Sequence, residues 1–182
     1  NNDISDDSVQ TVKQSPDSQT ALNPAANSDE NNKNAQNTNG DSLNNVVNTG
    51  TKVPKMSADE QKLLNLVNEA RREAGVEPLT IDADLLEVAR LKAKDMVENE
   101  YFTHQSPVYG SPFDMMRQFD ISFKTAGENI AGNETVEGAF NAWMNSPDHR
   151  KNILNANFQY IGIGVSEGSP YGKIIVEHFI GK

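Results

Sequence analysis

The sequence predicts an α+β domain over residues 57–182, because helix signals open this region and strand signals close it. The opening signals are a capping box and an amphipathic stripe, and the closing ones are two β-branched runs around a turn. Helical and strand segments do not alternate regularly, which argues against a parallel α/β sheet. We therefore expect one α+β domain with a single core.

The first helix is expected to begin after Ser57, which forms an S-x-x-E capping box with Glu60. Apolar residues then recur at spacings of three and four, which places them on one helix face that ends at Gly75. These residues are Leu63, Leu64, Val67, Ala70 and Ala74.

Four further helices are predicted from cap residues and apolar periodicity. The second begins at Asp82 or Asp84 and runs to about Asn99. The others are a short helix over 112–119 after Ser111, a helix opened by Thr135, and a short one over 149–154 after Ser146 and Pro147.

The two strand-like runs cover residues 160–165 and 174–179, and a turn-rich segment joins them. This arrangement predicts an antiparallel hairpin. Gly162 and Gly164 lie in the first run, where the lack of a side chain allows a neighbouring layer to pack closely. The aromatic residues, Trp143 among them, are expected to fill the core.

Residues 1–56 differ from the rest and are predicted to be a disordered, asparagine-rich, acidic leader or linker. The first 50 residues contain 12 asparagines, seven acidic side chains, two lysines and no aromatic residue. Such a composition cannot bury enough apolar surface to offset the entropy of ordering the chain.

Charge and hydropathy exclude several classes of function. The 182 residues have a net charge of −10, divided equally between residues 1–50 and 51–182, so neither part has the basic excess that binds nucleic acid or anionic membranes. No apolar run is long enough to span a bilayer. The absence of cysteine excludes disulfides and thiolate metal sites. Because the sequence begins at Asn1, we expect that a leader has been removed and that the protein is exported.

Two of the three histidines, His104 and His149, lie near helix ends, and Glu128 lies between them in a glycine-flanked apolar segment. The spacings are too long for a local metal motif. From residue types alone, a shared metal or acid/base site and scattered structural histidines both remain open. His178 is interpreted as a structural residue, on the surface if the neighbouring Glu177 points inward.

Five ordered segments resemble the bacterial branch of the CAP superfamily, the cysteine-rich secretory protein, antigen 5 and pathogenesis-related group, also called SCP domains. They cover residues 66–71 with Pro78 and Leu79, 104–106, 127–131, 142–154 and 161–165. The resemblance implies a three-layer α-β-α sandwich with a small antiparallel sheet, in a protein that is usually secreted. It also implies a cleft lined by two histidines and two glutamates, which in some members takes up a divalent ion.

Carried onto this sequence, the resemblance makes His104, His149 and Glu128 the candidate metal ligands. The second glutamate of the family pattern is replaced by Ser146, and either Glu177 or Glu137 could supply that carboxylate from elsewhere. We expect a divalent ion, with Zn²⁺ a candidate, to bind weakly and to be lost below about pH 6, as imidazoles with a pKa of about 6.5 become protonated.

Other polar residues have assigned roles in this cleft. Three polar residues are expected to orient the cleft side chains by hydrogen bonding to them. These are Asn129, Arg150 and Glu177. Ser106 could complete a Ser/His/Glu hydrolytic triad, but it precedes Pro107 and lacks a nucleophile elbow, so a hydroxyl that fixes the loop is the simpler interpretation. Ser146 is interpreted as a helix cap.

The leading hypothesis is an exported, monomeric binding or scaffold module at the cell surface or spore, with a protein or peptidoglycan of the envelope as its partner. The alternative is a metal-dependent hydrolase of peptide or cell-wall substrate with Glu128 as general base. Small-lipid carriage, implied only by some eukaryotic family members, ranks third.

Overall fold

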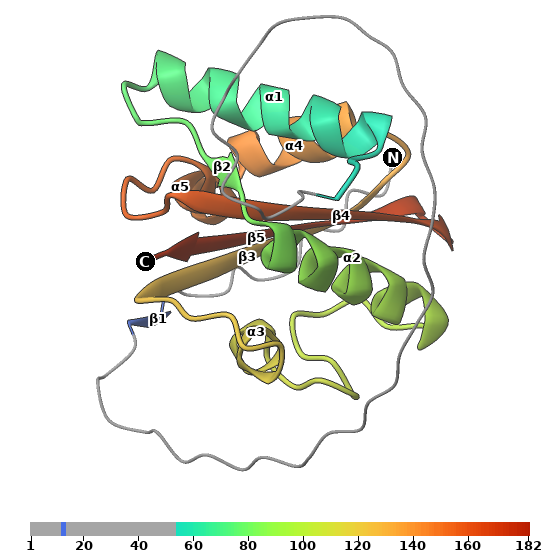
Figure 1. The fold of residues 1–182 in the computed structure, drawn as a ribbon. Coiled ribbons are helices and arrows are strands. Elements are labelled where there is room, and N and C mark those ends of the chain that lie inside the picture. The colour runs from blue at the N-terminus through green and yellow to red at the C-terminus, as the bar shows by residue number, and fades with distance from the viewer. Residues whose placement is uncertain (1–11, 14–53) are drawn as a thin grey trace, which may run out of the picture. The chain divides into compact units, whose positions relative to one another are not determined.

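A five-stranded sheet lies between two layers of helices in the computed structural model, which describes residues 12–13 and 54–182 (Figure 1). The helices are α1 (Ala58–Glu73), α2 (Ala83–Glu98), α3 (Pro112–Gln118), α4 (Val136–Asn145) and α5 (Pro147–Ile153). The strands are β1 (Val12–Lys13), β2 (Thr80–Ile81), β3 (Thr125–Asn133), β4 (Tyr160–Ser169) and β5 (Gly172–Gly181). The predicted α-β-α sandwich is confirmed.

The helices begin where the cap residues predicted. Ser57 and Glu60 form both hydrogen bonds of the capping box of α1. The side chains of Asp82, Ser111 and Thr135 each accept a hydrogen bond from a backbone N–H in the first turn of α2, α3 and α4. These bonds satisfy N–H groups that have no partner within the helix, and so they fix where each helix starts.

The sheet has the strand order β1-β3-β5-β4-β2. The predicted hairpin is confirmed, because β4 and β5 pair antiparallel along their lengths. Three strands, β1, β2 and β3, were not predicted. Strand β3 pairs antiparallel with β5 from Thr125 to Asn133, and β2 adds two residues parallel to β4. Val12 and Lys13, in the expected leader, pair with β3, and the remainder of residues 1–53 lies outside the described part of the chain.

Both faces of the sheet are buried along β3, β4 and β5, so alternate residues of these strands enter different cores. Ile175 and Phe179 pack with residues of α1, α4 and α5, including Trp143. Ile174, Val176 and Ile180 of the same strand pack on the side of α2 and α3. The aromatic residues mostly fill these cores as expected, although Phe119 is 43% exposed.

Helix α2 packs directly against β4. A Cβ atom placed on Gly162 or Gly164 would lie 2.2 Å from the carbonyl oxygen of Leu85 or 2.1 Å from that of Ala89. These glycines therefore permit the close approach that was predicted for them. The tight contact fixes α2 over the part of the sheet that carries the polar cluster described next.

Candidate functional site

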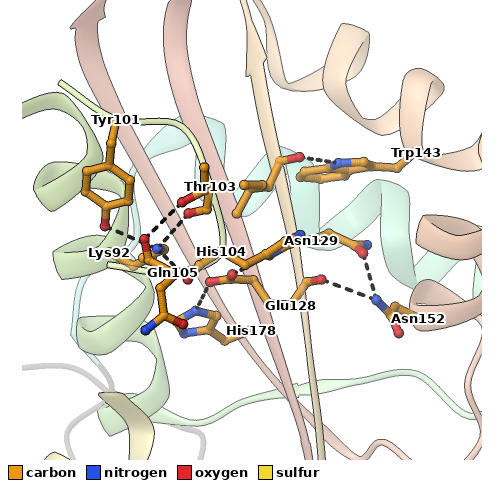
Figure 2. Close-up of polar contacts among 11 residues, drawn as sticks. Lys92, Tyr101, Thr103, His104, Gln105, Glu128, Asn129, Trp143, Asn152 and His178 are labelled. Atoms are coloured by element: carbon orange, nitrogen blue, oxygen red, sulfur yellow. Dashed lines mark hydrogen bonds and ion pairs between the residues drawn. The ribbon is translucent and has the colours of Figure 1, made fainter. Parts of the chain in front are cut away.

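The carboxylate of Glu128 lies between two imidazole rings on the α2 side of the sheet (Figure 2). Its Oε1 lies 2.6 Å from His104 Nδ1, and its Oε2 lies 2.6 Å from His178 Nε2. Glu128 on β3 and His178 on β5 are direct cross-strand partners, whereas His104 comes from the loop after α2. We call these three residues the Glu128 cluster.

The cluster is an ionised carboxylate held by two hydrogen-bond donors. Burial alone would raise the pKa of Glu128, but the hydrogen bonds from His104 and His178 outweigh it and lower this pKa to about 2. An ionised carboxylate only accepts hydrogen bonds, so His104 carries its proton on Nδ1 and His178 carries its proton on Nε2. Glu128 and His178 are fully buried, and the side chain of His104 is 14% exposed. His104 is thus the member of the cluster that reaches solvent.

Lys92 holds the loop that carries His104. Its ammonium group donates hydrogen bonds of 3.0 Å and 2.9 Å to the carbonyl oxygens of Thr103 and His104, and one of 3.1 Å to the Tyr101 hydroxyl (Figure 2). Burial lowers the pKa of Lys92, and the negative charges of Glu128 and Asp95 partly oppose this effect. The lysine therefore supplies a buried positive charge near the Glu128 carboxylate and fixes the backbone of His104.

Ser106 forms part of a second anchor in the same loop. Its hydroxyl donates a 2.6 Å hydrogen bond to Asp95 and accepts 3.0 Å hydrogen bonds from the backbone N–H groups of Val108 and Tyr109. Asp95 also accepts a hydrogen bond from the Tyr101 hydroxyl. This is the pattern expected of a hydroxyl that fixes a loop, and the Ser106 proton points to Asp95 rather than to a histidine.

A second polar group lies on the opposite face of the sheet. Asn129 follows Glu128 on β3, and its side-chain nitrogen donates a 3.0 Å hydrogen bond to Glu177 and a 3.3 Å bond to the backbone oxygen of His149. Asn152 of α5 donates a 2.9 Å bond to the Asn129 side-chain oxygen. Burial raises the pKa of Glu177 to about 8, although the bond from Asn129 opposes the shift, so this side chain is protonated at neutral pH.

His149 lies on α5 and is buried, with its Nδ1 2.8 Å from the Ser146 hydroxyl. Ser146 occupies the N-cap position of α5 as predicted, but its side chain makes no cap hydrogen bond and contacts His149 instead. Arg150 is exposed, so the structure does not bring its side chain into either buried group.

The structure therefore divides the predicted cleft residues between the two faces of the sheet. His104 and Glu128 meet as expected, while Asn129 and Glu177 meet each other on the face that α5 covers. Glu137 pairs with Lys62 of α1. The interpretation of His178 as a surface residue is wrong: both faces of the sheet are covered, so Glu177 and His178 are both buried.

These positions bear on the metal prediction. Both oxygens of Glu128 already accept hydrogen bonds from imidazoles, so the carboxylate is placed to orient His104 rather than to bind an ion itself. No group of three His, Asp or Glu side chains within the described ranges is arranged to hold a metal ion. The residues as placed do not form a complete metal site, and the weak site predicted for His104, His149 and Glu128 stays a prediction.

Comparison with known sequences decides the family. The sequence model of the cysteine-rich secretory protein family, CAP, matches residues 64–180. The chain belongs to this family. Its CAP domain, as matched, begins at Leu64 within α1 and ends at Ile180 within β5. The chain contains no cysteine, despite the family's description.

Relatives of this CAP domain occur in bacteria. The chain is 54% identical over 138 residues to uncharacterized protein YkwD of Bacillus subtilis, a match that covers 75% of this chain and 52% of the relative. It is 38% identical over 126 residues to uncharacterized membrane protein YlbC of the same species, covering 68% of this chain and 35% of the relative. The chain thus spans about half or less of the length of these relatives.

Solved structures share the fold. An extracellular protein with an SCP domain from Bacillus anthracis superposes with a TM-score of 0.64 at 35% identity, covering 68% of this chain and 40% of the other. An outer surface protein from Borrelia burgdorferi gives a TM-score of 0.63 at 28% identity, covering 68% and 92% of the two chains. Within the described residues of the CAP domain and its flanks, no helix has the length and hydropathy to cross a membrane.

Three residues of the site were missed by sequence reasoning. Lys92 and Asp95 lie on the buried face of α2, where charged residues interrupt an apolar stripe. His178 lies in an apolar strand run, and it is fully buried. All three are charged or titratable residues at positions that periodicity assigns to the core. This signal could have found them, because a buried group of this kind needs a hydrogen-bond or charge partner in the protein interior.

Proposed function

We propose that this protein is exported and acts at the cell surface as a binding module, with the loop of His104 as part of its recognition surface. The location is supported by the solved relatives, which are described as an extracellular protein and an outer surface protein. The partner we propose is a component of the cell envelope. The domain is proposed to act as a monomer.

The state of Glu128 is the observation that favours binding over hydrolysis. A general base works best with a pKa near the working pH and with an oxygen directed at the proton to be removed. The pKa of Glu128 is lowered to about 2, and both of its oxygens accept hydrogen bonds from His104 and His178. This carboxylate is suited to hold an imidazole rigidly and poorly suited to take a proton from water.

Rigidity is what a recognition surface gains from this arrangement. The side chain of His104 is held by Glu128, and its backbone is held by Lys92. Preorganised side chains lose less conformational entropy when a partner binds, which strengthens binding for the same contacts. The Ser106 anchor extends the same support to the residues that follow.

The experiment is a co-sedimentation assay with purified bacterial cell-envelope preparations. We expect the wild-type protein to be retained and the His104→Ala variant to lose most of that retention. Lys94→Met is the matched control, because the Lys94 side chain is 62% exposed on α2 and belongs to neither polar group. Equal retention of the wild type and His104→Ala would contradict the proposal.

The hydrolase alternative makes a different prediction for the same assay. Peptide or sugar fragments would be released into the supernatant, and Glu128→Gln would abolish the release while the protein stayed folded. Retention without release is the result that the binding proposal expects.

A further inference from the structure

A pocket of about 620 Å³ lies between the end of α2 and the turn that joins β4 to β5, and it does not include the Glu128 cluster. Its walls come from Glu100, Tyr101 and Phe102 on one side and from Ser169, Pro170 and Tyr171 on the other. This volume lies within the range of small-ligand pockets, about 300–1,000 Å³. The lining combines aromatic and apolar side chains with Ser169 and with Glu100, its one charged residue.

The aromatic walls are held in place by the fold. The rings of Phe102 and Tyr171 are tilted by 54° with their centroids 5.6 Å apart. Tyr171 packs on β3 at Gly132, where an added Cβ would lie 2.8 Å from its Cγ, so a larger residue there would displace the ring. Tyr101 is fixed through its hydroxyl by Asp95 and Lys92.

The ring of Tyr101 contacts a cation within the domain, the side chain of Lys92. The Lys92 ammonium group lies 4.8 Å from the centroid of this ring, so one aromatic member of the pocket wall takes part in a cation–π contact within the domain. Phe102 and Tyr171 line the same pocket, and no positively charged side chain lines it.

Glu100 supplies the negative charge from an unfavourable backbone conformation. It follows the C-cap residue Asn99 of α2 with a φ of 52°, in the left-handed region that glycine adopts most easily at this position. Among the described residues, Asp120 is the other non-glycine residue with a positive φ. Strained residues of this kind are concentrated at functional sites, and here the strained residue is the charged member of the pocket lining.

We propose that this pocket binds an organic cation that carries an alkylated ammonium group. Such a group combines an apolar surface, which suits the rings of Phe102 and Tyr171, with a positive charge, which suits Glu100. A primary ammonium ion is strongly hydrated and loses more on entering an apolar pocket. The inference goes beyond the proposed role of the His104 loop, because Glu100, Phe102 and Tyr171 line the pocket and belong to neither polar group described above.

The test is a titration with choline followed by the backbone amide signals in NMR spectra of the whole chain. We expect choline to shift the signals of residues 100–102, 168, 169 and 171. The neutral isostere 3,3-dimethylbutan-1-ol has the same shape without the charge, and we expect it to bind about tenfold more weakly. Equal affinities for the two compounds, or no shifts with choline, would overturn the proposal.

Glu100→Gly separates binding from stability. Glycine adopts the left-handed conformation freely, so this variant should raise Tm while it lowers the choline affinity to that of the neutral isostere. Asp120→Gly is the matched control: it should also raise Tm, and it should leave choline binding unchanged, because Asp120 does not line the pocket. His104→Ala should likewise bind choline as the wild type does. Unchanged choline binding by Glu100→Gly would contradict the assignment of Glu100.

Discussion

Glu128 and His178 face each other across β3 and β5, and the carboxylate of the first lies 2.6 Å from the ring nitrogen Nε2 of the second. The next pair in the same register, Asn129 and Glu177, is joined by a 3.0 Å hydrogen bond on the opposite face of the sheet. Two adjacent rungs of one ladder thus build two buried polar groups. One contains an anion and the other a neutral acid, and this difference leads to opposite responses to pH.

Glu128→Gln should destabilise the fold by about 1.5 to 3 kcal/mol at neutral pH, because it removes buried hydrogen bonds to a charged group. The folded pKa of about 2 lies below the ordinary value of 4.5, so the stabilisation from ionised Glu128 is complete above pH 4.5 and is lost as the pH falls towards 2. Urea denaturation at several pH values measures both effects.

Glu167→Gln is the control for this prediction, because the Glu167 side chain is 80% exposed and its loss should change stability by less than about 0.5 kcal/mol. If the difference between the wild type and Glu128→Gln stayed constant from neutral pH to pH 2, the pKa of Glu128 would not be lowered in the folded protein.

Glu177 should show the opposite dependence. Its folded pKa of about 8 lies above the ordinary value of 4.5, so the folded state keeps a proton that the unfolded chain loses. The contribution of Glu177 to stability should therefore fall as the pH rises from 4.5 to about 8, by on the order of 1 kcal/mol per pH unit. Glu177→Gln should remove this slope. The free energy of unfolding across that pH range checks the prediction, and a slope shared by both proteins would refute it.

Lys92→Met should destabilise the protein by about 2 to 3 kcal/mol, because it removes a buried charged donor and leaves the carbonyl groups of Thr103 and His104 without their partner. Hydrogen exchange should also become faster at the amide of Ser106, which is bonded to the Gly110 oxygen in the same loop. Lys94→Met, on the exposed side of the helix, should stay within about 0.5 kcal/mol of the wild type. Unchanged exchange at Ser106 in Lys92→Met would show that the lysine does not hold this loop.

The predicted metal site can be tested by calorimetric titration of the metal-stripped protein with Zn²⁺. We expect weak binding that disappears in His104→Ala. Glu128→Gln should weaken binding by about 10 to 100 fold, because the carboxylate orients His104 from behind. A heat signal that is the same in the wild type and His104→Ala would remove His104 from any metal site.

Most helix positions could be predicted because their signals are local. The side chains of Ser57, Asp82, Ser111 and Thr135 bond backbone groups within one turn, so the sequence around each start contains the information. Ser146 shows the limit of this reasoning. It stands at a cap position before a proline, yet its hydroxyl bonds His149, and a cap pattern does not reveal which partner the hydroxyl takes.

Strand β3 could not be predicted from its pattern. Its alternate residues enter different cores, so neither face of the strand is exposed, and glycines interrupt the run. The same double burial explains the error for His178. Alternation shows that Glu177 and His178 point to opposite faces, but only the full sandwich shows that both faces are covered. The Glu128 cluster depends on long-range pairing of β3 with β5, which the sequence expresses in no local motif.

The protonation of the histidine rings tests the account most directly. The chain contains three histidines, so ¹⁵N-labelling of histidine followed by long-range ¹H–¹⁵N NMR resolves each ring, and single substitutions assign them. Near neutral pH we predict that the His104 ring carries a proton on Nδ1 and the His178 ring carries one on Nε2, both directed at Glu128. Observation of His104 with its only proton on Nε2, or of His178 with its only proton on Nδ1, would contradict a carboxylate held between the two rings.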